Sequence, residues 1–164
     1  MGKGYDFSHL GALIVDDHEP SKILLDKILK ELGVRSVLTA RDNAEALEWF
    51  RKGLADLLIC EYSMSLHSGL DLAKRVRTGK DSPNPYIPVI MITGRVSWQH
   101  VRSALNAGVD HVLVKPASVR SLYAALKVLL EKRKPFVRTK DYFGPDRRRT
   151  KMAFEGPDRR SKKA

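Results

Sequence analysis

The run ALIVDD at residues 12–17 places four apolar residues directly before two aspartates. A short apolar run that is rich in leucine and β-branched residues, and is bounded by polar residues, is typical of a parallel strand buried on both faces. Four similar runs follow along the chain. The expected strands are residues 12–15, 36–39, 56–60, 88–92 and 111–114.

Segments with the apolar spacing of helices lie between and after these strands. Gly33 predicts the end of the first helix, and Asp42 and Ser118 are suited to cap the start of the second and the fifth. The expected helices are residues 23–32, 44–50, 70–76, 101–107 and 119–130. Five strands in alternation with five helices predict an α/β fold, a doubly wound five-stranded parallel sheet with helices on both faces.

Polar side chains follow four of the expected strands. Asp16 and Asp17 follow the first, Glu61 the third, Thr93 the fourth and Lys115 the fifth. Functional groups in open parallel sheets gather at the carboxyl ends of the strands. The sequence therefore predicts three carboxylates, a hydroxyl and an ammonium around one hollow. Clustered carboxylates repel one another and require a divalent cation or a lysine.

Residues 9–133 resemble the receiver domain of response regulators, as in the CheY-like chemotaxis proteins, whose fold is flavodoxin-like. The segment GVDHVLVKP at residues 108–116 is similar to the last strand of that family and its lysine. Asp16 and Asp17 match the metal-binding acids of the family, and Thr93 matches its switch hydroxyl. The resemblance implies transfer of a phosphoryl group from a histidine kinase to an aspartate, with a magnesium ion and no further cofactor.

Two departures from the family argue against phosphorylation as the input. Glu61 stands where the family has its phosphoacceptor aspartate, and its extra methylene moves the carboxylate by about an ångström, an error that can cost about 100-fold in rate. The longer side chain can also reach Lys115 and form an ion pair. Val112 stands where the family has its switch aromatic residue. We therefore expect a protein that is not an enzyme, with a vestigial phosphoacceptor pocket that binds magnesium only weakly at Asp16, Asp17 and Glu61.

The C-terminal segment carries a repeated motif. GPDRR occurs at residues 144–148 and again at 156–160. Residues 135–164 hold 10 Lys and Arg against 4 Asp and Glu, a large share of the net charge of +11. Because this tail has three prolines and no continuous apolar periodicity, we expect it to be disordered when alone and to attract an anionic partner.

Each GPDRR copy combines a rigid turn, an acceptor carboxylate and two arginines, with aromatic residues nearby. Arginine binds phosphate oxygens and guanine edges bidentately, and aromatic faces stack on bases. Two equal half-sites suit a two-fold symmetric ligand, and cyclic di-GMP has two phosphates and two guanines. The residues expected to contact it are Tyr142, Asp146, Arg147, Arg148, Arg149, Phe154, Asp158, Arg159 and Arg160.

The arginine-rich tail is similar to that of the Cle group of CheY-like cyclic di-GMP effectors. That resemblance implies a non-phosphorylatable adaptor that docks on the flagellar motor switch under control of the second messenger. Three alternatives stay open: nonspecific binding of nucleic acid through phosphate charge, a docking motif for another protein or a membrane surface, and duplication without function. The competing class is a response regulator still switched by phosphate or metal, with the tail as a nucleic-acid arm.

Composition sets the remaining bounds. The single cysteine, Cys60, excludes an internal disulfide framework. No signal-peptide core and no apolar stretch of about 20 residues is present, which predicts a cytoplasmic protein. The expected organisation is an N-terminal extension at residues 1–8, a receiver-like domain at 9–133 and an arginine-rich tail at 134–164.

Overall fold

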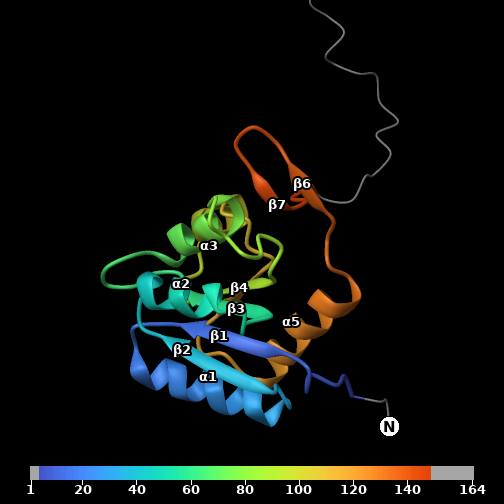
Figure 1. Ribbon diagram of the computed structural model, residues 1–164. Coiled ribbons are helices and arrows are strands. Elements are labelled where there is room, and N and C mark those ends of the chain that lie inside the picture. Colours follow the sequence, from blue (N-terminus) through green and yellow to red (C-terminus); the bar gives the residue numbers. More distant parts are fainter. Residues whose placement is uncertain (1–3, 149–164) are drawn as a thin grey trace, which may run out of the picture.

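The computed structural model describes residues 4–148, and over this range the chain forms seven strands and five helices (Figure 1). The larger sheet has the strand order β2-β1-β3-β4-β5, with every neighbouring pair parallel. This confirms the expected doubly wound, five-stranded fold. In chain order the elements are β1 (Gly11–Val15), α1 (Glu19–Glu31), β2 (Ser36–Ala40), α2 (Asn43–Arg51), β3 (Leu57–Glu61), α3 (Gly69–Thr78), β4 (Val89–Thr93), α4 (Trp98–Asn106), β5 (His111–Val114), α5 (Val119–Glu131), β6 (Phe136–Arg138) and β7 (Phe143–Pro145).

Helices cover both faces of the sheet because strand side chains alternate between them. Ala12 and Ile14 of β1 belong to a core shared with α1 and α5. Leu13 and Val15 of the same strand belong to a second core, shared with α2, α3 and α4. Figure 1 shows α1 below the sheet, and α2 and α3 above it. All five residues of β1 are buried, as the apolar run ALIV requires.

The predicted helix ends are present. The Asp42 carboxylate accepts a hydrogen bond of 2.9 Å from the backbone N–H of Glu45. Ser118 and Ser121 form a reciprocal capping box at the start of α5. Gly33 follows α1 in the left-handed conformation, with φ of 87°. Within residues 4–148, no helix is long and apolar enough to cross a membrane.

The segment after α5 differs from the expected disorder. Residues 136–138 and 143–145 pair as an antiparallel hairpin, β6–β7, which lies beyond α3 in Figure 1. The physical reason is aromatic burial: Phe143 is buried, and its ring packs on Tyr86 and Phe136 with centroids 5.1 and 5.4 Å away. The first half of the tail is thus part of the folded body. Residues 149–164 lie outside the described range.

A buried ionic cluster holds the hairpin on the body. Arg77 of α3 is 2% exposed and donates from Nη2 to the Asp110 carboxylate at 2.8 Å. Arg133, just after α5, donates from Nε to the same carboxylate at 3.0 Å. The Phe136 ring lies against both guanidinium groups, 5.0 Å from that of Arg77 and 4.6 Å from that of Arg133. Burial of Arg77 lowers its pKa to about 10, and the neighbouring Asp110 carboxylate opposes that shift, so the guanidinium stays charged at neutral pH.

The glycine of the first GPDRR copy has a packing role. A Cβ atom on Gly144 would lie 2.7 Å from the hydroxyl oxygen of Tyr142 and 2.8 Å from the Cα of Gly108. Gly108 itself has a φ of 85° and faces the carbonyl of Phe143. The two glycines therefore permit the hairpin to approach the turn between α4 and β5 closely. The close approach fixes the position of the residues that follow Gly144.

Candidate functional site

Lys115 occupies the centre of the predicted pocket at the carboxyl ends of the strands. Its Nζ lies 3.0 Å from Asp16 Oδ2 and 2.5 Å from Glu61 Oε2. The predicted ion pair between Glu61 and Lys115 is confirmed. Burial disfavours the charged ammonium, but hydrogen bonds to Glu61 and Asp16 outweigh burial and raise the pKa of Lys115. The ammonium is therefore held charged between the two buried carboxylates.

The other two pocket residues are engaged elsewhere. The Asp17 carboxylate accepts hydrogen bonds from the hydroxyl and the backbone N–H of Ser65, and these lower the pKa of Asp17. The Thr93 hydroxyl donates to the carbonyl of Arg95 at 2.9 Å and accepts from the N–H of the same residue at 3.1 Å. The structure brings Asp16, Glu61 and Lys115 into direct contact. Asp17 and Thr93 bind neighbouring loops.

The carboxylates do not form a magnesium site in this arrangement. A magnesium ion needs oxygen ligands in nearly octahedral geometry, but the Lys115 ammonium stands between Asp16 and Glu61, and Asp17 is turned to Ser65. Among residues 4–148, no three His, Cys, Asp or Glu side chains are grouped so that they could hold a metal ion. The pocket as folded is an ion-pair cluster centred on Lys115.

Val112 and Cys60, like Glu61, belong to the core around this pocket. Val112 packs against the hydrophobic core under α2, α3 and α4. As a valine it has no aromatic ring that could move between a buried and an exposed position. Cys60 is fully buried, and burial raises the pKa of its thiol to about 12. A thiol with such a pKa is protonated at neutral pH and unreactive.

A second concave site lies at the amino ends of the strands, opposite the acidic pocket, between α4 and the hairpin. It is a groove of about 700 Å³, here called the arginine groove. Four arginines line it: Arg102 comes from α4, Arg138 from β6, and Arg147 and Arg148 from the segment after β7. Its lining residues are Arg102, Leu105, Asn106, Val137, Arg138, Thr139, Tyr142, Asp146, Arg147 and Arg148.

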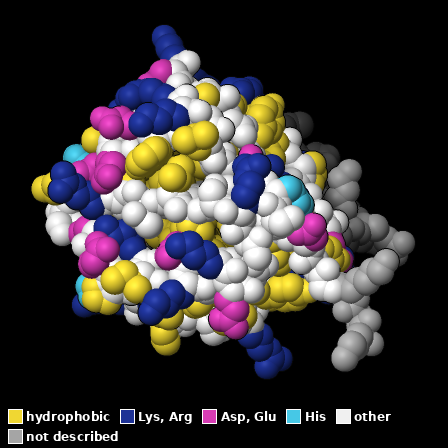
Figure 2. Space-filling model, turned by 60° about the horizontal axis from the view of Figure 1, so that its bottom comes forward, with side chains coloured by type: hydrophobic (Ala, Val, Ile, Leu, Met, Phe, Trp, Pro, Cys, Tyr) yellow, Lys and Arg dark blue, Asp and Glu magenta, His cyan; other side chains and the backbone are white. Residues whose placement is uncertain are grey.

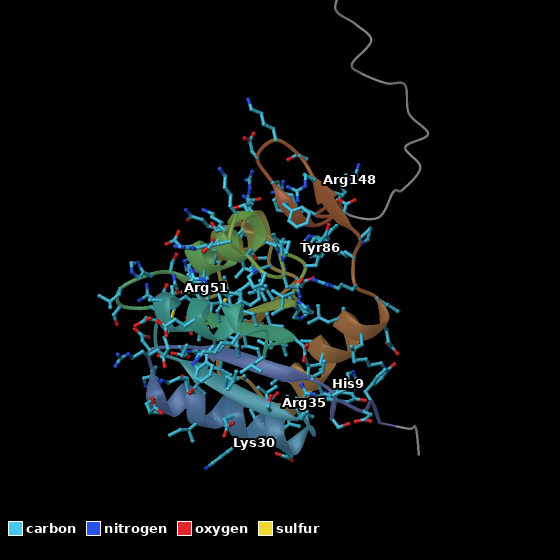
Figure 3. All side chains as sticks on the ribbon, viewed as in Figure 1. His9, Lys30, Arg35, Arg51, Tyr86 and Arg148 are labelled. Atoms are coloured by element: carbon cyan, nitrogen blue, oxygen red, sulfur yellow. The ribbon has the colours of Figure 1, made fainter. Side chains whose placement is uncertain are left out.

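The charge of the groove contrasts with another face of the molecule. Figure 2 looks toward the bottom of Figure 1, and there the Lys and Arg side chains are interspersed with Asp and Glu and separated by apolar patches. In Figure 3, Lys30 and Arg35 lie at that end, whereas Arg148 lies beside the hairpin and Tyr86 lies between the hairpin and the body. The groove thus gathers arginines at one end of the fold.

The first GPDRR copy forms the rim of the arginine groove. Arg147 lies over the ring of Tyr142, 4.1 Å from its centroid, and donates to the side-chain oxygen of Asn106. Arg148 binds the Asp146 carboxylate through Nε and Nη2, at 3.0 and 2.8 Å, and lowers the pKa of Asp146 to about 2. Tyr142 donates from its hydroxyl to the carbonyl of Pro145 at 2.7 Å. Its ring is covered by Arg147 on the side of the groove.

The remaining predicted ligand residues, Arg149, Phe154, Asp158, Arg159 and Arg160, lie outside the described residues. Sequence reasoning did not identify Arg102, Asn106 and Arg138 as part of the groove. One signal for the hairpin was present: FVR and YFG are short apolar-containing runs separated by a few polar residues, a pattern that favours a β-hairpin. Nothing local marks Arg102, because its role depends on the hairpin docking beside α4.

Comparisons with known proteins agree with the fold. Residues 12–127 match the family described as response regulator receiver domain. The chain is 31% identical over 120 residues to the chemotaxis protein CheY-3 of Vibrio cholerae, covering 73% of this chain and 91% of that protein. It is 37% identical over 119 residues to the chemotaxis protein CheY1 of Helicobacter pylori, covering 72% and 94%.

Solved structures give the same result. A putative response regulator from Chloroflexus aurantiacus superposes with a TM-score of 0.68 at 29% identity, covering 75% of this chain and 98% of that one. The chemotaxis protein CheY4 of Vibrio cholerae superposes with a TM-score of 0.65 at 27% identity, covering 72% and 96%. The fold, the family match and these relatives together show that the chain belongs to the response regulator receiver domain family.

Proposed function

We propose that this receiver-family protein is a non-phosphorylatable signalling adaptor that binds cyclic di-GMP through its two GPDRR segments. The observation that carries the proposal is the duplicated motif, whose first copy forms the rim of a groove lined by four arginines. Several guanidinium groups on one concave surface repel one another, and an anion with more than one phosphate relieves that repulsion. Cyclic di-GMP has two phosphates and two guanine bases that match two equal half-sites.

The contacts of the first copy suggest how its residues divide their roles. Asp146 binds Arg148 and so orients that guanidinium. Arg147 is held by Tyr142 and Asn106 beside the groove. We propose that Arg147 and Arg148 bind phosphate or guanine edges, and that Asp158, Arg159 and Arg160 act in the same way in the second copy. Arg149, Tyr142 and Phe154 complete the set as flanking contacts.

The closed acidic pocket supports an input other than phosphate. A phosphoacceptor must present a free carboxylate oxygen to the incoming phosphorus atom. Here one Glu61 oxygen contacts the Lys115 ammonium at 2.5 Å, and the other accepts from the N–H of Ser63 at 3.3 Å. The pocket is therefore proposed to be vestigial, with structural ion pairs in place of phosphoryl chemistry.

The partner is proposed to be a protein, with the flagellar motor switch as the first candidate, because curated relatives of the chain are named as chemotaxis proteins. The surface proposed for docking is that of α4 and α5. Trp98, at the start of α4, is 81% exposed, and Val96 just before it is 65% exposed. Large exposed apolar side chains near one another mark a surface suited to a partner.

Calorimetric titration of the full chain at physiological salt tests the proposal. Cyclic di-GMP, GTP and a short single-stranded DNA are titrated separately into wild-type protein and into the Arg147→Gln and Arg159→Gln variants. We expect micromolar or tighter binding of cyclic di-GMP alone, weakened in both variants and unchanged in Arg120→Gln, which alters an arginine of α5 outside the groove. A silent dinucleotide together with DNA binding that falls steeply with salt would instead indicate a nonspecific phosphate arm.

A further inference from the structure

We infer that the arginine groove is a composite phosphate site in which the receiver body supplies a binding residue, Arg102 of α4, and the hairpin supplies another outside the repeated motif, Arg138 of β6. This inference rests on the proposed function and extends it. The first GPDRR segment then does not bind the nucleotide alone: it lines a groove whose opposite wall is α4.

The groove brings these residues together from three parts of the chain. Arg102 and Asn106 stand one turn apart on α4, Arg138 ends β6, and Arg147 follows β7. The hydrogen bond from Arg147 to Asn106 joins the motif directly to α4. Asp110 holds Arg77 and Arg133 against Phe136 of the hairpin, and Gly144 packs closely on Gly108. Both walls of the groove are therefore set before a ligand arrives. Preorganisation of this kind reduces the ordering cost of binding.

The charge in the groove is incompletely neutralised. Asp146 pairs with Arg148. Within residues 4–148, no carboxylate lies within ion-pair distance of Arg102, Arg138 or Arg147. Two of these guanidinium groups lie on aromatic rings instead, Arg138 at 4.2 Å from the centroid of Phe143 and Arg147 at 4.1 Å from that of Tyr142. Stacking fixes the plane of each guanidinium, and the N–H groups of Arg138, together with those of Arg147 that do not donate to Asn106, can bind phosphate oxygens.

Ligand in this groove is adjacent to the exposed tryptophan of α4. Arg102 and Leu105 line both the arginine groove and a neighbouring hollow around Trp98. Trp98 and Arg102 are four residues apart on α4 and lie on the same side of that helix. A phosphate that draws Arg102 into the groove therefore changes the surroundings of Trp98. The nucleotide and a protein docked at Trp98 are coupled through one shared arginine.

The experiment uses the full chain with two probes. Cyclic di-GMP is titrated by calorimetry into wild-type protein and into Arg102→Gln, Arg138→Gln and the control Arg120→Gln. Pyrophosphate, which offers phosphate oxygens but no guanine, is titrated in parallel while Trp98 fluorescence is recorded in a Trp49→Phe background. We expect Arg102→Gln and Arg138→Gln each to weaken cyclic di-GMP about tenfold. Arg120→Gln should bind as wild type does, and pyrophosphate should change Trp98 fluorescence only when Arg102 is present.

The outcomes separate the two proposals. If cyclic di-GMP binds all four proteins equally, the proposed function stands and the composite site is refuted. If cyclic di-GMP fails to bind wild type but pyrophosphate binds in an Arg102-dependent manner, the groove is a phosphate site and the identity of the nucleotide is wrong. If neither probe binds, both are refuted. Far-UV circular dichroism of each variant checks that these exposed substitutions leave the fold intact.

Discussion

The buried cluster that anchors the hairpin gives the most demanding test of the structure. Asp110 precedes β5, and its side chain is 2% exposed. It accepts from Arg77 Nη2 at 2.8 Å, from the backbone N–H of Val89 at 2.9 Å and from Arg133 Nε at 3.0 Å. Replacing Asp110 by Asn keeps the shape but removes the charge, and it turns an N–H₂ group toward the guanidinium groups.

The magnitude follows from the burial of Arg77. Removal of one partner from a buried ion pair costs about 3–5 kcal/mol, because the other charge is left uncompensated in a poorly polar environment. Asparagine retains one acceptor oxygen, so the lower limit applies and we expect a loss of about 3 kcal/mol. For a protein of this length, such a loss lowers Tm by roughly 6–12 °C. It is also a large part of the stability of a typical domain.

Urea and thermal unfolding, followed by circular dichroism, measure the effect. The matched control is Asp81→Asn, since Asp81 also binds two arginines, Arg51 at 2.9 Å and Arg75 at 3.5 Å, but is about half exposed. In the control variant both midpoints should equal those of the wild-type protein within experimental error, because exposed ion pairs contribute little to stability. Equal effects of the two substitutions, or no change in Asp110→Asn, would refute the reasoning that burial makes this cluster essential.

Three further predictions concern other parts of the molecule. Incubation with acetyl phosphate and magnesium should add no phosphoryl group by intact mass, because Glu61 is paired with Lys115, and a stable magnesium-dependent gain would contradict this. Phe136→Ala should speed amide hydrogen exchange across residues 136–148 and weaken cyclic di-GMP, because it removes the ring between Arg77 and Arg133; protection equal to wild type would contradict it. Burial lowers the pKa of His111, so the unfolded chain takes up a proton first and stability falls as the pH drops below about 6.5. His111→Gln should reduce the change of the urea midpoint with pH between about pH 7 and pH 5. An unchanged pH dependence would assign it to other groups.

The sheet and the acidic pocket were predictable because they depend on local patterns. Each apolar run became a strand within one residue of its expected bounds, since a strand buried on both faces needs a continuous apolar sequence. The ion pair of Glu61 with Lys115 followed from the length of one side chain. The directions taken by Asp17 and Thr93 were not predictable. They depend on the loop positions of Ser65 and Arg95, which no periodicity specifies.

The hairpin and the arginine groove were missed for a different reason. Composition alone predicted disorder for the whole tail, because charge and proline dominate it. The burial of Phe143, however, depends on Tyr86 in a loop far away in sequence. The rule for open sheets points to the carboxyl ends of the strands, and the tail motif by itself does not reveal that α4 lies beside it. The arginine groove instead is lined by Asn106, which ends α4 shortly before β5, and so lies at the amino ends of the strands.

Helix α4 connects the acidic pocket with the arginine groove. α4 begins at Trp98, after the carboxyl end of β4, and ends at Asn106, before the amino end of β5. It therefore runs from the edge of the acidic pocket to the edge of the arginine groove. In the proposed function the ligand acts on α4 at this second end, where Arg102 and Asn106 line the groove. Under that proposal the α4 surface around Trp98 is kept for a partner, while the input moves from the carboxyl ends of the strands to their amino ends.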